Sequence, residues 1–75
     1  MTTLELAGWR PGLETVELIK AVKAHASRSL SEAKSDVERL LDGEVVVLEF
    51  STNESREAFR KIAEGLGARV RLSPS

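Results

Sequence analysis

The chain has 75 residues, of which 41% are apolar and 31% charged, with a net charge of −1 and no cysteine. This composition predicts a single small domain over residues 1–75 and excludes disulfide scaffolds and thiolate metal sites. Nucleic-acid binding is not expected, because phosphate contacts require a surplus of basic residues. No segment resembles a signal peptide or a membrane span, so a cytoplasmic location is expected and no membrane partner.

Apolar periodicity predicts a strand followed by two helices in the first half of the chain. Residues 2–9 alternate apolar and polar side chains as a half-buried strand does, and Pro11-Gly12 ends that strand. Helical periodicity then covers about 14–26 and 30–41. Ser29 and Glu32 have the spacing of a capping box at the start of the second helix.

The second half predicts a strand, a helix and a last strand. Residues 44–50 are rich in β-branched side chains, and residues 68–72 alternate as the final strand. A second capping-box pattern, Ser51 to Glu54, opens the helix between them, which ends near Leu66. The helical positions assigned to the core are Leu18, Ala21, Val22 and His25, then Leu30, Ala33, Val37, Leu40 and Leu41, then Phe59, Ile62, Ala63 and Leu66. In the last strand Val70 and Leu72 are assigned inward.

The resulting order is β-α-α-β-α-β. A strand–helix–strand crossover makes the last two strands parallel to each other, and the first strand fits between them, antiparallel to both. We therefore expect an α+β fold of two layers, a three-stranded sheet with three helices on one face. Val45, Val47 and Glu49 would then lie on the open face, where a half-apolar surface would permit self-association as a weak homodimer.

The first helix has apolar residues on two opposite faces. Val16 and Ile19 lie opposite the core positions, together with Lys20 and Lys23. One interpretation is an apolar patch with a cationic edge that binds an acidic protein. The other is that Ile19 packs between the helices, Val16 touches the first strand and the lysines are solvated.

No group of residues has the spacing of a catalytic or metal site. His25 is the only histidine and lies on the core side of its helix, where a packed or boundary histidine is expected. The carboxylates are assigned to solvent faces, and the serines near residue 29 to helix capping. Trp9 either covers an edge of the core or anchors a partner. The chain is expected to be neither an enzyme nor a cofactor-binding protein.

Several segments resemble the C-terminal domain of the bacterial ribosomal stalk protein. They are Ile19-Lys20-Ala21-Val22-Lys23, Leu30-Ser31-Glu32-Ala33-Lys34, Val37-Glu38 and Gly67-Ala68-Arg69-Val70, with Gly12 at the turn before the first helix. The resemblance covers nearly the whole chain. It implies a non-enzymatic interaction domain whose contact surface lies on the first two helices, with a translational GTPase or the ribosome as partner. Carried over by position, the contact residues are Val16, Ile19, Lys20, Lys23 and Lys34.

The chain also departs from this pattern. Glu17 stands at a contact position that a small residue usually holds, and Ser27-Arg28-Ser29 replaces a glycine turn. The family's N-terminal dimerisation region and hinge have no counterpart, so a free-standing relative is expected. The same architecture resembles the Clp protease adaptor. That adaptor's acidic recognition motif is missing, so a peptide-binding adaptor is the alternative at the level of the fold only.

Overall fold

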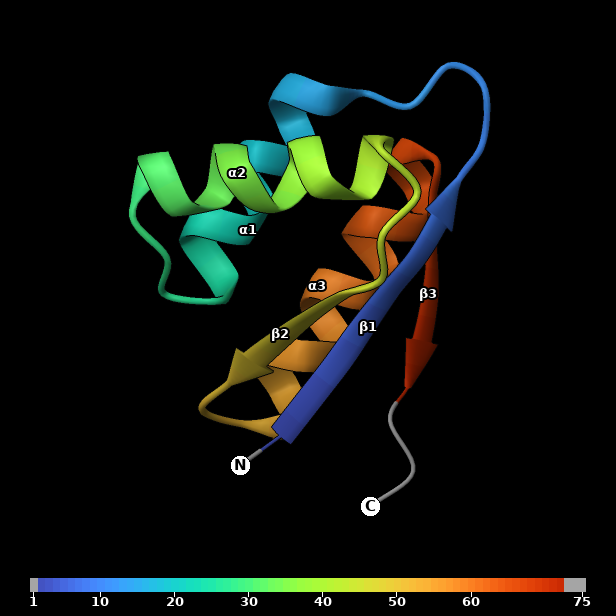
Figure 1. Cartoon of the computed structure of the whole chain (residues 1–75). Helices are drawn as coiled ribbons and strands as arrows, with labels where there is room; N and C mark the ends of the chain where they lie inside the picture. The colour runs from blue at the N-terminus through green and yellow to red at the C-terminus, as the bar shows by residue number, and fades with distance from the viewer. Residues whose placement is uncertain (1, 73–75) are drawn as a thin grey trace.

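The computed structural model describes residues 2–72 and confirms the expected order of elements. The elements are β1 (Thr2–Trp9), α1 (Thr15–His25), α2 (Leu30–Leu41), β2 (Val46–Phe50), α3 (Asn53–Leu66) and β3 (Ala68–Leu72). All three strands belong to one open sheet, so the α+β prediction is confirmed (Figure 1). The strand expected over residues 44–50 begins two residues later, at Val46.

The sheet has the order β2-β1-β3, with β1 antiparallel to both neighbours as expected. Leu4 lies opposite Leu48 on one side and opposite Leu72 on the other. One face of the sheet is buried through Leu4, Leu6, Val46, Leu48, Phe50 and Ala68. The other face leaves Val45 and Val47 exposed, as the alternation of side chains predicts.

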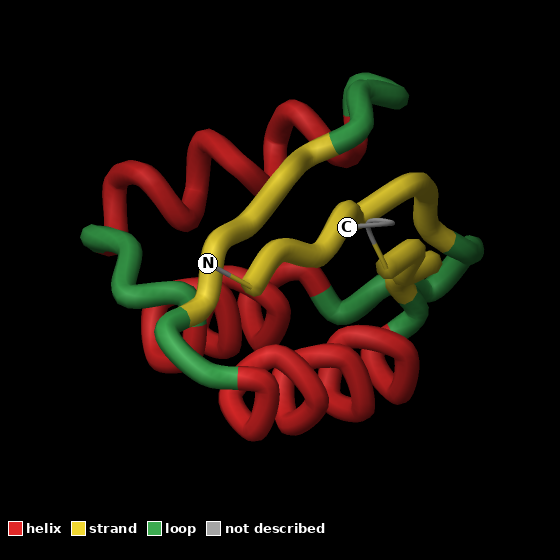
Figure 2. Tube along the Cα trace, turned by 90° about the horizontal axis from the view of Figure 1, so that it is seen from below, coloured by secondary structure: helices red, strands yellow, loops and turns green. Residues whose placement is uncertain are grey.

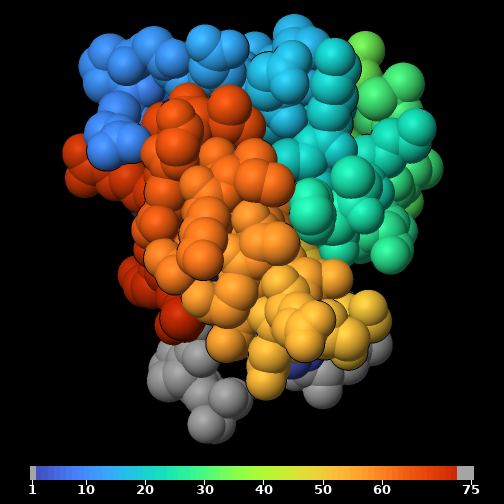
Figure 3. Space-filling view, turned by 180° about the vertical axis from the view of Figure 1, so that it is seen from behind, coloured from blue at the N-terminus to red at the C-terminus, as the bar shows by residue number. Residues whose placement is uncertain are grey.

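The helices supply the rest of a single apolar core. In α1 the buried side chains are Leu18, Ala21 and Val22, and in α3 they are Phe59 and Ala63. These two helices lie side by side, α1 in cyan and α3 in orange (Figure 3). Seen from below, α1 and α3 lie next to each other against the strands, and α2 follows the flank of the sheet (Figure 2). The helices therefore cover one face and leave the other open.

Two side-chain caps fix the starts of α2 and α3. The Glu32 N–H donates to Ser29 Oγ at 3.1 Å, and the Ser29 N–H donates to the Glu32 carboxylate at 3.1 Å, so the first capping box is confirmed. The second prediction is wrong by one residue. Thr52, whose backbone is extended, is the cap of α3 and accepts from the Ser55 N–H at 3.0 Å.

Four residues assigned to the core are exposed instead: Leu30 by 54%, Leu41 by 37%, Ile62 by 41% and Leu72 by 42%. Three of them stand at the ends of α2 and β3, where the neighbouring layer no longer covers the side chain. Ile62 lies on the flank of α3, because that helix packs through Phe59 and Ala63. Periodicity identified the helix faces but not how far each face is covered.

Candidate protein-binding surface between the first two helices

An apolar pocket of about 280 Å³ lies between α1 and α2. Its lining residues are Val16, Ile19, Lys20, Leu30 and Lys34. Four of these belong to the contact set expected from the sequence. Lys23, the fifth expected residue, is exposed on α1 and is not among the lining residues. We call the five lining residues the α1–α2 pocket.

The helical repeat of α1 brings its three pocket residues to one face of the helix. Val16, Ile19 and Lys20 are spaced i, i+3 and i+4 and therefore share one face. Ile19 is half-buried and packs against the core, as the packing interpretation expected. Val16 is 62% exposed, which contradicts that interpretation at this position. The exposed Val16 side chain therefore forms apolar surface on the outside of the domain.

Leu30 is the pocket residue that sequence reasoning missed. It was counted in the buried stripe of the second helix because it stands three residues before Ala33. In the structure it is the first residue of α2, directly after the Ser29 cap, and it is more than half exposed. The signal available in the sequence was its place next to the capping box, since the first turn of a helix is often incompletely covered.

The edge of the α1–α2 pocket is cationic. Lys20 Nζ lies 3.6 Å from Glu17 Oε1, but both side chains are more than half exposed, so this pair contributes little to stability. Lys34 and the neighbouring Lys23 form no ion pair among residues 2–72. Glu17 therefore offsets part of the charge of one lysine and leaves the other two available.

A buried carboxylate holds the turn that leads to Leu30. Asp36 is 5% exposed, which corrects the expectation that all carboxylates lie on solvent faces. Its Oδ2 lies 3.5 Å from Arg28 Nε and its Oδ1 lies 3.9 Å from an Arg39 terminal nitrogen. Arg28 follows Ser27, whose φ of 53° reverses the chain after α1. The Arg28–Asp36 pair thus ties this turn to the middle of α2.

Opposite pKa shifts occur at the two acidic residues near Arg28. Burial raises the pKa of Asp36 and outweighs the attraction of Arg28 and Arg39; Oδ2 also has no hydrogen-bond donor. Hydrogen bonds from the Ser29 backbone and hydroxyl lower the pKa of Glu32, and Arg28 adds to this effect. The Glu32 carboxylate therefore stabilises the fold at any pH above the pKa that it has in the unfolded chain. This contribution is lost as the pH falls through the lower pKa of the folded state.

Asp36→Asn is expected to raise the free energy of unfolding at about pH 7. Because the folded pKa of Asp36 is raised, its protonated form stabilises the fold fully below the unfolded pKa, and this is lost as pH rises through the folded value. Asparagine keeps the shape without the charge, so the gain should disappear near pH ~3. Urea unfolding of the wild type and the variant, at about pH 7 and at pH ~3, measures this change in the free energy of unfolding. Asp42→Asn, at the exposed end of the same helix, is the control. A loss of stability at neutral pH would mean that the ion pairs outweigh burial.

No protein-family model matches this chain, and no curated protein matches it either. Within residues 2–72, no helix combines the length and apolar character that crossing a bilayer requires. The same residues contain no group of three or more histidine, aspartate or glutamate side chains placed to hold a metal ion.

Proposed function

We propose that the chain is a non-enzymatic interaction domain that binds an acidic protein partner at the α1–α2 pocket. The observation that carries this proposal is the joining of Val16, Ile19 and Leu30 into one exposed apolar pocket with two lysines at its edge. Protein interfaces combine a central apolar contact with a polar edge, and complementary charge selects the partner. Lys20 and Lys34 would select carboxylates.

The size of the pocket favours side chains of a protein over a small molecule. Its volume of about 280 Å³ lies just below the range of roughly 300–1,000 Å³ that is usual for small-molecule sites. One or two apolar side chains from a partner helix would fill it. The resemblance to the ribosomal stalk C-terminal domain supplies a translational GTPase as the first candidate partner.

Titration of the isotope-labelled domain with a purified bacterial translational GTPase tests the proposal by NMR. Binding is expected to shift the signals of Val16, Ile19 and Leu30 first. Lys20→Glu/Lys34→Glu should weaken binding by at least about tenfold, because each reversal replaces an attraction by a repulsion. The exposure of Lys20 makes a loss of folding unexpected.

Lys61→Glu is the matched control, since Lys61 is an exposed lysine on α3 and does not line the pocket. It should bind as the wild type does. Equal affinities for all three proteins, or signal changes confined to another surface, would contradict the proposal. Val16→Asp provides a second variant that acts on the apolar contact and leaves both lysines in place.

The open face of the sheet supports self-association as a second candidate. Val45 and Val47 are 45% and 48% exposed on that face. Sedimentation at several concentrations, with Val47→Thr as the variant, would detect a homodimer. The peptide-binding adaptor has less support, because an N-terminal amine needs an acidic pocket and the α1–α2 pocket presents lysines.

A further inference from the structure

The face of the sheet that the helices leave open carries apolar and charged side chains in a fixed arrangement. Val45 and Val47 lie on its β2 side and are 45% and 48% exposed. The strand register places the other side chains relative to these two. Val47, Glu5 and Arg71 form one row across the three strands, because Glu5 pairs with both of the others. Apolar surface on β2 therefore lies beside charged residues on β1 and β3.

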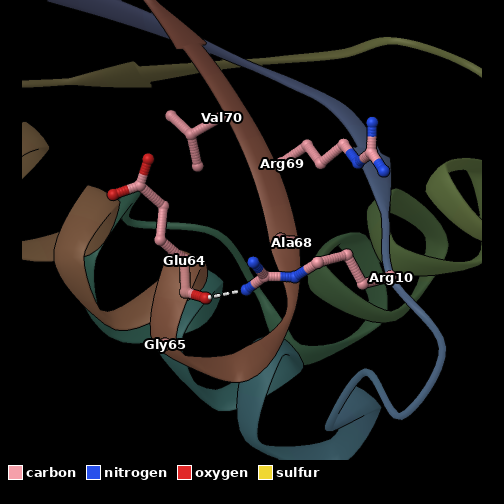
Figure 4. Close-up of a pocket in the computed structure, with 6 residues that line it drawn as sticks. All are labelled: Arg10, Glu64, Gly65, Ala68, Arg69 and Val70. Carbon is pink, nitrogen blue, oxygen red and sulfur yellow. Dashed lines mark hydrogen bonds between the residues drawn. The ribbon is translucent and has the colours of Figure 1, made fainter.

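Glu49 and Arg69 lie at diagonally opposite corners of this open face. The strands β2 and β3 are both antiparallel to β1, so they run parallel to each other. Glu49 comes two residues after Val47 on β2, whereas Arg69 comes two residues before Arg71 on β3, toward the other end of the sheet. Figure 4 shows the Arg69 side chain extending from β3 toward β1.

These two corner residues are exposed charges without a partner in the described chain. Neither Glu49 nor Arg69 forms an ion pair among residues 2–72. In the row between them, Arg71 Nε lies 2.6 Å from Glu5 Oε1, so the charges at the centre of the face offset each other. The open face therefore has one unpaired negative and one unpaired positive charge, at the two ends of a diagonal.

We propose that the open face binds a second copy of this chain, with Glu49 of each copy paired to Arg69 of the other. This inference rests on self-association, the second candidate of the proposed function, and specifies how the two copies are arranged. A twofold axis between the two sheets, at right angles to the Glu49–Arg69 diagonal, brings each Glu49 over the Arg69 of the second copy. The same axis passes between Val45 and Val47, so the four valines of the two copies meet beside it.

Charge complementarity favours a second copy over an unrelated partner. With one unpaired acid and one unpaired base, the face is complementary to itself after a twofold rotation, and two equivalent ion pairs form together. The strands of the two copies then cross at a steep angle, close to the orthogonal arrangement of packed sheets. The α1–α2 pocket belongs to the helices, so this dimer leaves it available to an acidic partner.

Sedimentation velocity over a range of concentrations tests this arrangement through an exchange of the two charges. Glu49→Arg and Arg69→Glu should each weaken dimerisation by at least about tenfold, because each places two pairs of like charges in the interface. The double variant Glu49→Arg/Arg69→Glu rebuilds both ion pairs with reversed sign and should restore dimerisation. Within one copy the two residues lie at opposite corners, so an intramolecular ion pair does not account for such a rescue.

Glu38→Arg is the matched control, since Glu38 is an exposed glutamate on α2 and not on the open face. It should dimerise as the wild type does, and circular dichroism checks that every variant is folded. A wild type that stays monomeric up to about 1 mM would overturn self-association and this arrangement with it. Single variants that dimerise like the wild type, or a double variant without rescue, would overturn this arrangement alone.

Discussion

Phe59→Ala is expected to lower the free energy of unfolding by about 3–5 kcal/mol, the range for phenylalanine removed from a packed core. Phe59 is completely buried, and its ring centroid lies 5.3 Å from that of Phe50 in a tilted arrangement. It joins α3 to β2, and its ring also lies 6.4 Å from the half-buried His25 of α1. A domain of this length has a total stability of about 4–11 kcal/mol. The variant should therefore lose between about a quarter and all of the stability of the domain at 25 °C.

Ile62→Ala is the control for this prediction. Helical periodicity groups Ile62 with Phe59 on one apolar stripe, but Ile62 is 41% exposed. Its truncation should lower the stability by less than about 1 kcal/mol, since little apolar area leaves the core. Urea unfolding followed by circular dichroism measures both variants. Losses of similar size would show that the stripe is buried as a whole and that the exposure of Ile62 is wrong.

Gly67→Ala is expected to lower the free energy of unfolding by about 2 kcal/mol or more. Gly67 ends α3 with a φ of 110°, and a left-handed conformation costs a residue with a Cβ about 1–2 kcal/mol. A Cβ there would also lie 3.2 Å from the Leu13 Cα, so the Leu13 backbone would have to shift by a few tenths of an ångström. The Gly67 carbonyl accepts the Arg10 N–H at 2.8 Å, so strain here also reaches the turn after β1.

Gly65→Ala, two residues earlier, should have the opposite sign. Gly65 is inside α3, and a Cβ added there meets no atom within 4 Å. Alanine is the better helix former, so a gain of about 0.5–1 kcal/mol is expected. Thermal or urea unfolding of the two single variants measures the difference. A loss at residue 65, or no loss at residue 67, would contradict the described end of α3.

Arg10 and Arg69 line a second pocket, of about 610 Å³, where the turn after β1 meets the end of α3, and they show why the lining of a pocket can escape sequence reasoning. Arg10 stands in a turn and Arg69 in the last strand, and 58 residues separate them in the chain. No spacing rule relates such positions. They line the same pocket because β1 and β3 are neighbours and because the turn after β1 packs on the end of α3, where the Glu14 N–H donates to the Leu66 carbonyl at 3.0 Å.

The sequence alone determined the order of the elements, the α+β class and most of the core. Local patterns suffice for this, because alternation, helical spacing and the Ser29–Glu32 cap act over only a few residues. The two faces of the first helix were also visible locally, and they predicted Val16, Ile19 and Lys20 of the α1–α2 pocket, whereas Lys34 came from the family resemblance.

The tertiary structure decided how far each face is covered. Leu30 and Ile62 follow the same apolar spacing as buried neighbours, yet both are exposed because no second layer reaches them. Asp36 looks like a surface carboxylate in the sequence and is buried because Arg28 and Arg39 approach it from the turn and from α2. Coverage and charge pairing depend on which elements pack together, and packing over long sequence separations has no local signal.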